Sequence, residues 1–168
     1  MLILIDTEFT GLDQPQPKLI SLGMADETGR WFYAEMPEAE YRHECSDWVV
    51  ENVLPHLWGG DYVLPVPQFQ ERLRSWIMEI QDRSMLVTDA PDFDFELVKA
   101  HLDPWPRNLA KVPLQFDTTA MGVNRQGWLA GIMAKYHTPD RPEHHALHDA
   151  FALREGLIAA LDRGWRPR

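Results

Sequence analysis

The first nine residues, Met1-Leu-Ile-Leu-Ile-Asp-Thr-Glu-Phe, join a strand pattern to two acidic side chains. The apolar run of residues 2–5 is typical of a strand that is buried on both faces. Asp6 and Glu8 are two positions apart, so on a strand both point to the same face of the sheet. Two carboxylates in a buried strand are costly to desolvate unless a cation neutralises them. The alternative is that the strand ends before Asp6 and that both acids are solvated.

The remainder of the chain combines strand and helix patterns. Residues 19–25 and 30–34 are a predicted hairpin around an Asp-Glu-Thr-Gly turn. Apolar spacing and turn residues predict strands at 85–88 and 112–116, helices at 46–54, 68–82, 94–102 and 128–136, and a last helix from 142 or 143 to about 162. This order predicts an α/β fold with a mixed central sheet flanked by helices. The length of 168 residues suits a single domain spanning 1–168.

The charge balance limits the kinds of partner. Sixteen basic residues against 26 acidic ones give a formal charge of −10, which argues against a broad basic face for nucleic acid. Carboxylates that hold divalent cations remain compatible with this charge, because the ions become the largest local positive charges. The single cysteine, Cys45, fits a reducing compartment. Without a signal peptide or membrane span, we expect a soluble, cytoplasmic protein.

Further acids and a histidine follow later in the chain. Asp94 comes directly after the predicted strand at 85–88, where the alternative role is capping of the next helix. His144 and Asp149 lie near the start of the last helix, and a histidine beside a bound cation can accept a proton from water. The alternatives are an exposed histidine-rich helix start, or zinc chelation by His144 and His148. A structural zinc site needs four ligands, and Cys45 gives it little support.

Carboxylate oxygens suit Mg²⁺ or Mn²⁺ better than a soft metal. Two such ions, roughly 3.5–4 Å apart, clamp a phosphodiester between an activated water and the leaving oxygen. The acids therefore point to a hydrolytic site for phosphodiesters.

The ordered motifs Asp6-Thr-Glu-Phe-Thr-Gly-Leu12, Phe93-Asp94 and His144-x-Ala-x-x-Asp149-Ala150 resemble those of the DEDDh family of 3'-5' exonucleases, which has the RNase H-like fold. The segment Trp48-Val-Val-Glu-Asn-Val-Leu-Pro is similar to a small bacterial subgroup typified by a mycobacterial 3'-5' exoribonuclease. With it, the resemblance covers nearly the whole chain.

The resemblance implies a role for each matched residue. Asp6 would bridge two Mg²⁺ ions, for which Mn²⁺ can substitute, with Glu8 and Asp149 completing the inner site. Asp94 would serve the second ion, in part through water, and His144 would be the general base. The implied product is a nucleoside 5'-monophosphate. The candidate substrate-binding residues are Thr7, Phe9, Thr10, Leu12 and Phe93.

The sequence also departs from the family. Many relatives carry His-Asn at the places of Asp89 and Ala90, so the amide that contacts substrate in those relatives is missing here, while the implied metal site is unaffected. His145 stands beside the implied base and competes with it for the role. Phe95 and Trp128 are left out of the site, because most aromatic residues belong to a core.

The leading hypothesis is an exoribonuclease acting on single-stranded or overhanging RNA 3' ends, with no membrane partner. The alternatives are a proofreading-type DNA exonuclease and a non-catalytic nucleic-acid or protein interaction module on the same fold. The sequence cannot separate RNA from DNA, because that choice depends on a group that reads the 2'-hydroxyl. Seven tryptophans suggest an interface and hence a homodimer.

Overall fold

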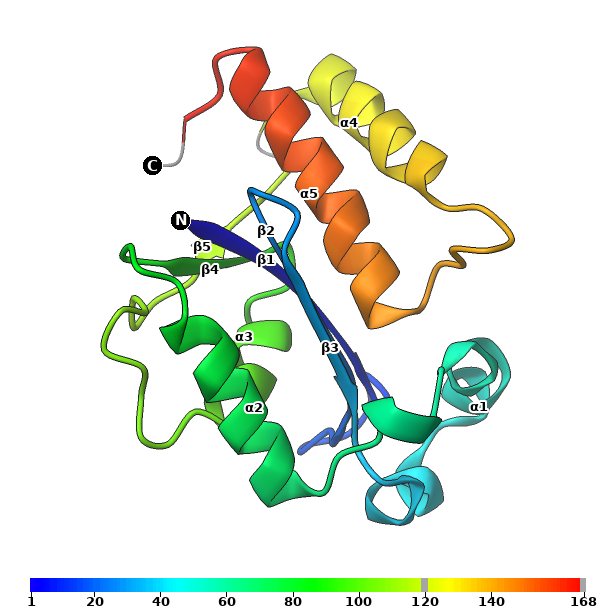
Figure 1. The fold of residues 1–168 in the computed structure, drawn as a ribbon. Coiled ribbons are helices and arrows are strands. Elements are labelled where there is room, and N and C mark those ends of the chain that lie inside the picture. The colour runs from blue at the N-terminus through cyan, green and yellow to red at the C-terminus, as the bar shows by residue number, and fades with distance from the viewer. Residues whose placement is uncertain (119–120, 167–168) are drawn as a thin grey trace.

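Strand β1 (Leu2–Phe9) lies at the centre of a five-stranded mixed sheet in the computed structural model, which describes residues 1–118 and 121–166 (Figure 1). The strand order is β3-β2-β1-β4-β5. The antiparallel part comprises β1, β2 (Leu19–Asp26) and β3 (Trp31–Glu35). On the other side, β4 (Met85–Thr88) and β5 (Leu114–Gln115) run parallel to β1.

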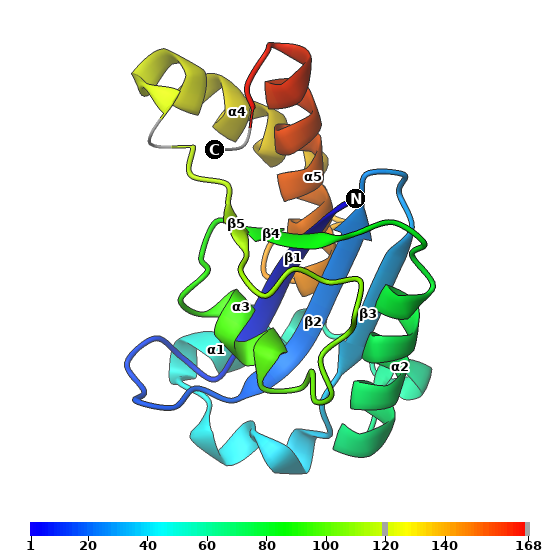
Figure 2. The same ribbon diagram turned by 90° about the vertical axis from the view of Figure 1, so that its left-hand side faces the viewer.

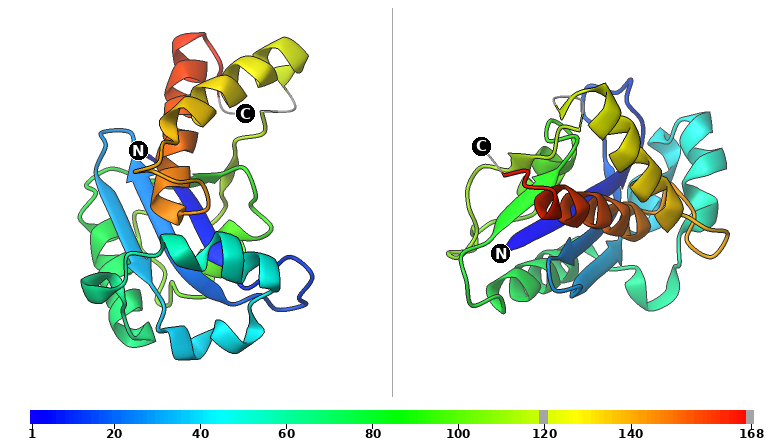
Figure 3. Two further views of the ribbon diagram at one scale, coloured as in Figure 1. Left: turned by 90° about the vertical axis from the view of Figure 1, so that its right-hand side faces the viewer. Right: turned by 90° about the horizontal axis from the view of Figure 1, so that it is seen from above.

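Helices cover both faces of this sheet. Helices α2 (Val66–Met78) and α3 (Asp94–Lys99) lie on one face (Figure 2). The opposite face carries α5 (Ala146–Asp162), with α4 (Val123–Tyr136) packed beside it (Figure 3). Helix α1 (Asp47–Asn52) lies near the end of β1, between short 3-10 turns at Glu38–Glu40, Arg42–Glu44, Leu54–His56 and Gly60–Tyr62. The predicted mixed sheet flanked by helices is confirmed.

Alternation along β1 divides the core between the two faces. Ile3 and Ile5 are fully buried in the apolar cluster that includes α2 and α3. Leu4 points the other way and joins Leu153 and Leu157 of α5. Continuing the same alternation, Asp6 and Glu8 follow Leu4 on the face that α5 covers.

Gly23 allows α5 to reach the sheet. It pairs with Asp6 across β1 and β2, so the two residues share one face. A Cβ added at Gly23 would lie 2.2 Å from the carbonyl carbon and oxygen of Ala146, and 2.3 Å from the amide nitrogen of Leu147. The first turn of α5 therefore rests directly on the backbone of β2, which only glycine permits.

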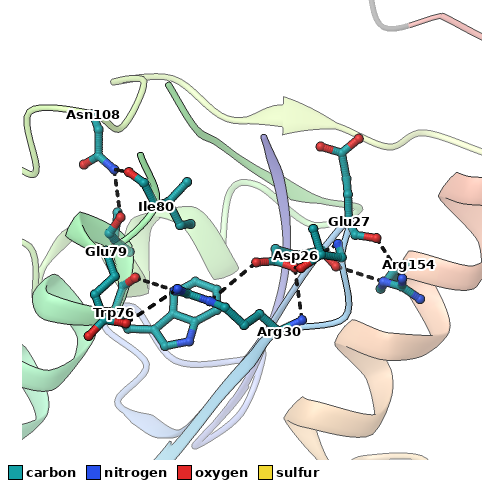
Figure 4. A network of polar contacts seen from close by, with 10 residues as sticks. Asp26, Glu27, Arg30, Trp76, Glu79, Ile80, Asn108 and Arg154 are labelled. Carbon is teal, nitrogen blue, oxygen red and sulfur yellow. Dashed lines mark hydrogen bonds and ion pairs between the residues drawn. The ribbon is translucent and has the colours of Figure 1, made fainter. Parts of the chain in front are cut away.

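At the β2–β3 turn, a polar network joins the sheet to helices on both of its faces (Figure 4). Arg154 of α5 donates to the carbonyl oxygens of Asp26 and Glu27 at 2.8 Å each. Arg30 donates to the carbonyl oxygen of Trp76 in α2 at 2.7 Å and lies 3.6 Å from the Asp26 carboxylate. These contacts hold α5 and α2 on the β2–β3 turn.

Several predicted boundaries were wrong. The last helix begins at Ala146 rather than at 142 or 143, because His144 has a left-handed φ of 61° that no α-helix accommodates. Helix α4 starts at Val123, earlier than the predicted 128, while α3 ends at Lys99 and β5 has only two residues. Within the described residues, no helix is long and apolar enough to cross a membrane.

Candidate functional site

Asp6 and Glu8 both lie inside β1, which continues to Phe9. Glu8 is 8% exposed and Asp6 is half-buried, so the alternative in which the strand ends before two solvated acids is wrong. Across the β1–β2 ladder, Asp6 faces Gly23 and Glu8 faces Ser21. Because Gly23 has no side chain, the start of α5 can pack closely against this face of the sheet. Helix α5 thereby brings Asp149 to the face that carries Asp6 and Glu8.

Asp94 is the first residue of α3, but it does not cap the helix with its side chain. Its Oδ1 accepts hydrogen bonds from the amide of Thr7 at 3.1 Å and from the Thr7 hydroxyl at 2.6 Å. Its Oδ2 accepts a hydrogen bond from the Thr88 hydroxyl. Asp94 thus lies at the N-terminus of α3, while its carboxylate is oriented by hydrogen bonds from β1 and β4 rather than by a capping bond to its own helix.

The start of α5 contributes the fourth acid and a histidine. Glu8, His144 and Asp149 each offer one ligand atom, and these atoms all lie within 4.8 Å of one another. His144 precedes the helix, and its left-handed backbone belongs to a sparsely populated region for a non-glycine residue. Its ring packs edge-to-face against Trp48 of α1, with 4.9 Å between ring centroids.

Burial raises the pKa of all four carboxyl groups, and repulsion between neighbouring acids adds to this at Asp6 and Glu8. Burial raises the pKa of Asp6 well above its usual value, and repulsion from Asp94, Asp149, Glu8 and Asp89 adds to this. Burial, followed by repulsion from Asp149 and Asp94, likewise raises the pKa of Glu8. Burial raises the pKa of Asp94 to about 6 and that of Asp149 to about 7. Each ionised acid is thus held in an unfavourable environment that a divalent cation would relieve.

A set of oxygen ligands with this charge fits a hard divalent cation such as Mg²⁺ or Mn²⁺. Asp6 is the acid on which the repulsion of the other three converges. The residues therefore fit the ion that the sequence predicts.

His145 has no access to this cluster. It is fully buried and stacks on Tyr33 at 4.5 Å and on His148 at 4.1 Å. Burial lowers the pKa of His145 to about 3, so its ring is neutral. Of the two neighbouring histidines, only His144 lies beside the acids.

The zinc alternative finds no support in the position of His148. Its Nδ1 lies 3.3 Å from the carbonyl oxygen of Pro142, and its ring stacks on buried His145. Among the described residues, the group that can hold a metal contains His144 but not His148.

A pocket of about 430 Å³ opens beside the acids, lined by Glu8, Phe9, Gly11, Leu12, Asp13, Ser46, Trp48, Val49 and Val53. Leu12 and Trp48 are 70% and 52% exposed at its rim. Large exposed apolar side chains beside a cluster of acids are suited to contact a nucleobase.

The five candidate substrate-binding residues divide into two groups. Phe9 and Leu12 line the pocket, and Phe93 stacks on Phe9 with 5.2 Å between centroids. Thr7 and Thr10 are engaged inside the protein. Thr7 holds Asp94, while the Thr10 hydroxyl donates to Gln14 at 2.5 Å and its amide bonds the carbonyl of Lys18.

Sequence reasoning missed three residues that shape the site. Trp48 enters the sequence prediction as part of a helix and of the subgroup motif but not as a site residue, although an aromatic residue on a short exposed helix is a candidate contact for a base. Gly23 interrupts a predicted strand, a pattern that marks close approach of another backbone. Asp89 was noted as a departure from the family, yet its charge contributes to the raised pKa of Asp6.

The chain was compared with known families, curated proteins and solved structures. No family model matches the sequence. No curated protein matches it either. Among solved structures, the chain is similar to a 3'-exonuclease described in 3'-end-specific recognition of a histone mRNA stem-loop, at 16% identity and a TM-score of 0.63. It is also similar to a full-length 3'-exonuclease, at 16% identity and a TM-score of 0.65. Each similarity covers 99% of this chain and 84% of the other.

The fold is RNase H-like. At this low identity the two similarities establish the fold, and they do not extend to the mycobacterial-type subgroup, which stays a prediction.

Proposed function

We propose that the protein is a metal-dependent 3'-5' exonuclease that acts on RNA 3' ends, single-stranded or overhanging. The observation that carries this proposal is the convergence of Asp6, Glu8, Asp94 and Asp149, which come from three distant segments, around one mutually repelling cluster. Such a cluster has no structural benefit by itself, because like charges at close range destabilise the fold. A bound divalent cation would neutralise these charges, so we interpret the cluster as a cation site.

Asp6, Glu8, Asp94 and Asp149 would hold two Mg²⁺ ions, or Mn²⁺ in their place. When bound, the ions supply positive charge that activates the attacking water and stabilises the leaving oxygen. Asp94 reaches this position because Thr7 and Thr88 fix its carboxylate. Glu8 and Asp149 approach each other across the contact between β1 and the start of α5.

His144 is the proposed general base. A neutral imidazole near the carboxylates can take a proton from water through a ring nitrogen. The contact with Trp48 and the left-handed backbone of His144 hold the ring at the rim of the acid cluster. The buried state of His145 leaves it unable to perform the same role.

The pocket beside Glu8 is the proposed site for the terminal nucleotide. Leu12, Phe9 and Trp48 offer apolar surface to its base. A net charge of −10 suits an enzyme that holds one chain end rather than a long duplex. RNA is favoured as substrate because one of the structurally similar 3'-exonucleases is described with an mRNA stem-loop.

The test is hydrolysis of matched 3'-overhang RNA and DNA oligonucleotides in Mg²⁺, with products resolved by length. We expect stepwise shortening of the RNA from its 3' end, release of nucleoside 5'-monophosphates and loss of activity in EDTA. Asp6→Asn should abolish hydrolysis, while Asp82→Asn, a change of an exposed acid outside the cluster, should not.

Other outcomes separate the alternatives. Faster shortening of DNA than RNA would assign a DNA exonuclease. No hydrolysis of either substrate by a protein that still binds the oligonucleotide would instead assign a non-catalytic module. Endonucleolytic fragments would contradict the proposed directionality.

A further inference from the structure

A second histidine lies at the acid cluster. The Nε2 of His137 is 3.4 Å from Oδ1 of Asp149, and the two side chains are 14% and 21% exposed. His137 follows the last residue of α4, whereas Asp149 lies in the first turns of α5. The contact therefore joins the α4–α5 connection to one of the proposed metal ligands.

The connection around His137 is held in place by its own contacts. Thr138 and Arg141 exchange two backbone hydrogen bonds, of 3.0 and 2.8 Å. The guanidinium of Arg141 stacks over the ring of Tyr136 at 4.3 Å, and Tyr136 stacks on Phe151 of α5. Residues on either side of His137 are thus fixed to α5 and to each other, so that the imidazole is carried on an ordered segment.

The two ring nitrogens of His137 differ in their surroundings. Nδ1 is buried and has no hydrogen-bond partner among the described residues. Nε2 lies 3.4 Å from Oδ1 of Asp149. Nε2 is therefore the nitrogen through which the ring can act on this carboxylate.

We infer that His137 is a positioning residue for Asp149, donating from Nε2 to Oδ1 and fixing how this carboxylate is presented to a divalent cation. The inference rests on the proposed function for the identity of Asp149 as a metal ligand. Groups that orient a metal ligand from outside the coordination sphere raise metal affinity without touching the ion. Backbone amides of His144 and His145 also act on Asp149, but they belong to its own helix start, whereas His137 ties it to another segment.

A purely structural role for His137 makes a different prediction. If the ring only fills space at the end of α4, then a ring of similar size without nitrogen atoms will leave metal binding unchanged. If it orients Asp149, the loss of the donor will weaken metal binding even where the fold is intact. The stability of the variant and its metal affinity therefore separate the two roles.

The test is titration of the purified protein with Mn²⁺ by calorimetry, together with thermal unfolding in EDTA. His137→Phe keeps an aromatic ring but removes the donor, and we expect its Mn²⁺ affinity to fall about tenfold or more. His137→Gln keeps an N–H donor and should bind Mn²⁺ within about threefold of wild type. The matched control is His101→Phe, since His101 also has a buried, unpartnered Nδ1 but packs on Phe69 in the cluster with α2.

Wild-type Mn²⁺ affinity in His137→Phe, or an equal loss in His101→Phe, would overturn the inference. A His137→Gln variant that keeps the wild-type melting temperature yet binds Mn²⁺ as weakly as His137→Phe would also overturn it. Failure of the proposed function looks different, because the wild type would then show no exonuclease activity whatever the effect on Mn²⁺ binding. Conversely, an active enzyme whose Mn²⁺ affinity is indifferent to His137 would retain the function and lose only the positioning role.

Discussion

Gly23 and Ala146 touch through their backbones, and this contact positions α5 relative to β1. The approach leaves no space for a Cβ on Gly23, which would lie 2.2 Å from the Ala146 carbonyl group. Since Asp149 is three residues beyond Ala146 and Asp6 pairs with Gly23, the same contact sets the separation of two proposed metal ligands.

Gly23→Ala should therefore damage the site as well as the fold. The new methyl group has to push the backbone of α5 away, and overpacking of this kind costs about 1–3 kcal/mol or more. We expect a lower melting temperature and a fall in exonuclease activity of at least about tenfold, measured on the same RNA oligonucleotide. The misplacement of one ligand by about 1 Å is sufficient for such a loss.

The matched control for this change is Gly127→Ala in α4, where a Cβ meets nothing within 4 Å. Replacing a helical glycine by alanine stabilises by roughly 0.5–1 kcal/mol. We expect Gly127→Ala to raise the melting temperature slightly and to leave hydrolysis unchanged. Full activity in Gly23→Ala would show that the close approach does not set the site.

Thr7 contributes to the site through Asp94. Thr7→Val removes the hydroxyl that bonds Oδ1 at 2.6 Å but keeps the amide bond to the same oxygen. We expect stability to fall by about 1–2 kcal/mol and hydrolysis to fall more than tenfold. Thr7→Ser keeps the hydroxyl and should restore most of the activity. If Thr7 binds substrate instead, Thr7→Val will raise KM and leave the Mn²⁺ affinity of the free protein unchanged.

Stability of the protein in EDTA should fall as the pH rises. Asp149, with a folded-state pKa raised to about 7, and Asp94, raised to about 6, hold protons that the unfolded chain releases near the ordinary value of 3.8. Between these values the folded state binds more protons, so the free energy of unfolding decreases from about pH 4 to about pH 7. Asp6 and Glu8 shift in the same direction.

Thermal unfolding at pH 5 and pH 8, with EDTA or with excess Mg²⁺, measures this effect. We expect a lower melting temperature at pH 8 in EDTA and recovery with Mg²⁺, because ligand binding to the folded state stabilises it. Asp149→Asn should flatten the pH dependence in EDTA. A melting temperature that rises from pH 5 to pH 8 in EDTA would contradict the raised pKa values.

Local patterns predicted the framework correctly but not the contacts between its parts. The apolar run of β1 and the turn of the β2–β3 hairpin are local features, and all three strands lie where the sequence predicts them. The predicted start of α5 is too early because His144 has a left-handed backbone, and because the first turn of the helix begins where Ala146 and Leu147 pack on Gly23. Local propensity contains no information on such contacts.

For the site too, local patterns predict which residues take part but not the contacts between distant segments. Alternation on β1 placed Asp6 and Glu8 on one face, and the motif spacing selected Asp94, His144 and Asp149. The hydrogen bonds from Thr7 and Thr88 that orient the Asp94 carboxylate depend on the pairing of β1 with β4, which local sequence patterns do not predict. Cytoplasmic localisation and the homodimer stay predictions.

Diffraction from crystals soaked with Mn²⁺ and a nucleoside 5'-monophosphate is the decisive measurement, because anomalous scattering locates the ions independently of any assumed site. We expect two Mn²⁺ peaks, about 3.5–4 Å apart, among the carboxylates of Asp6, Glu8, Asp94 and Asp149, with the phosphate between them and His144. Absence of Mn²⁺ from this cluster at saturating concentration, with the four carboxylates remaining protonated or paired to protein groups, would contradict it.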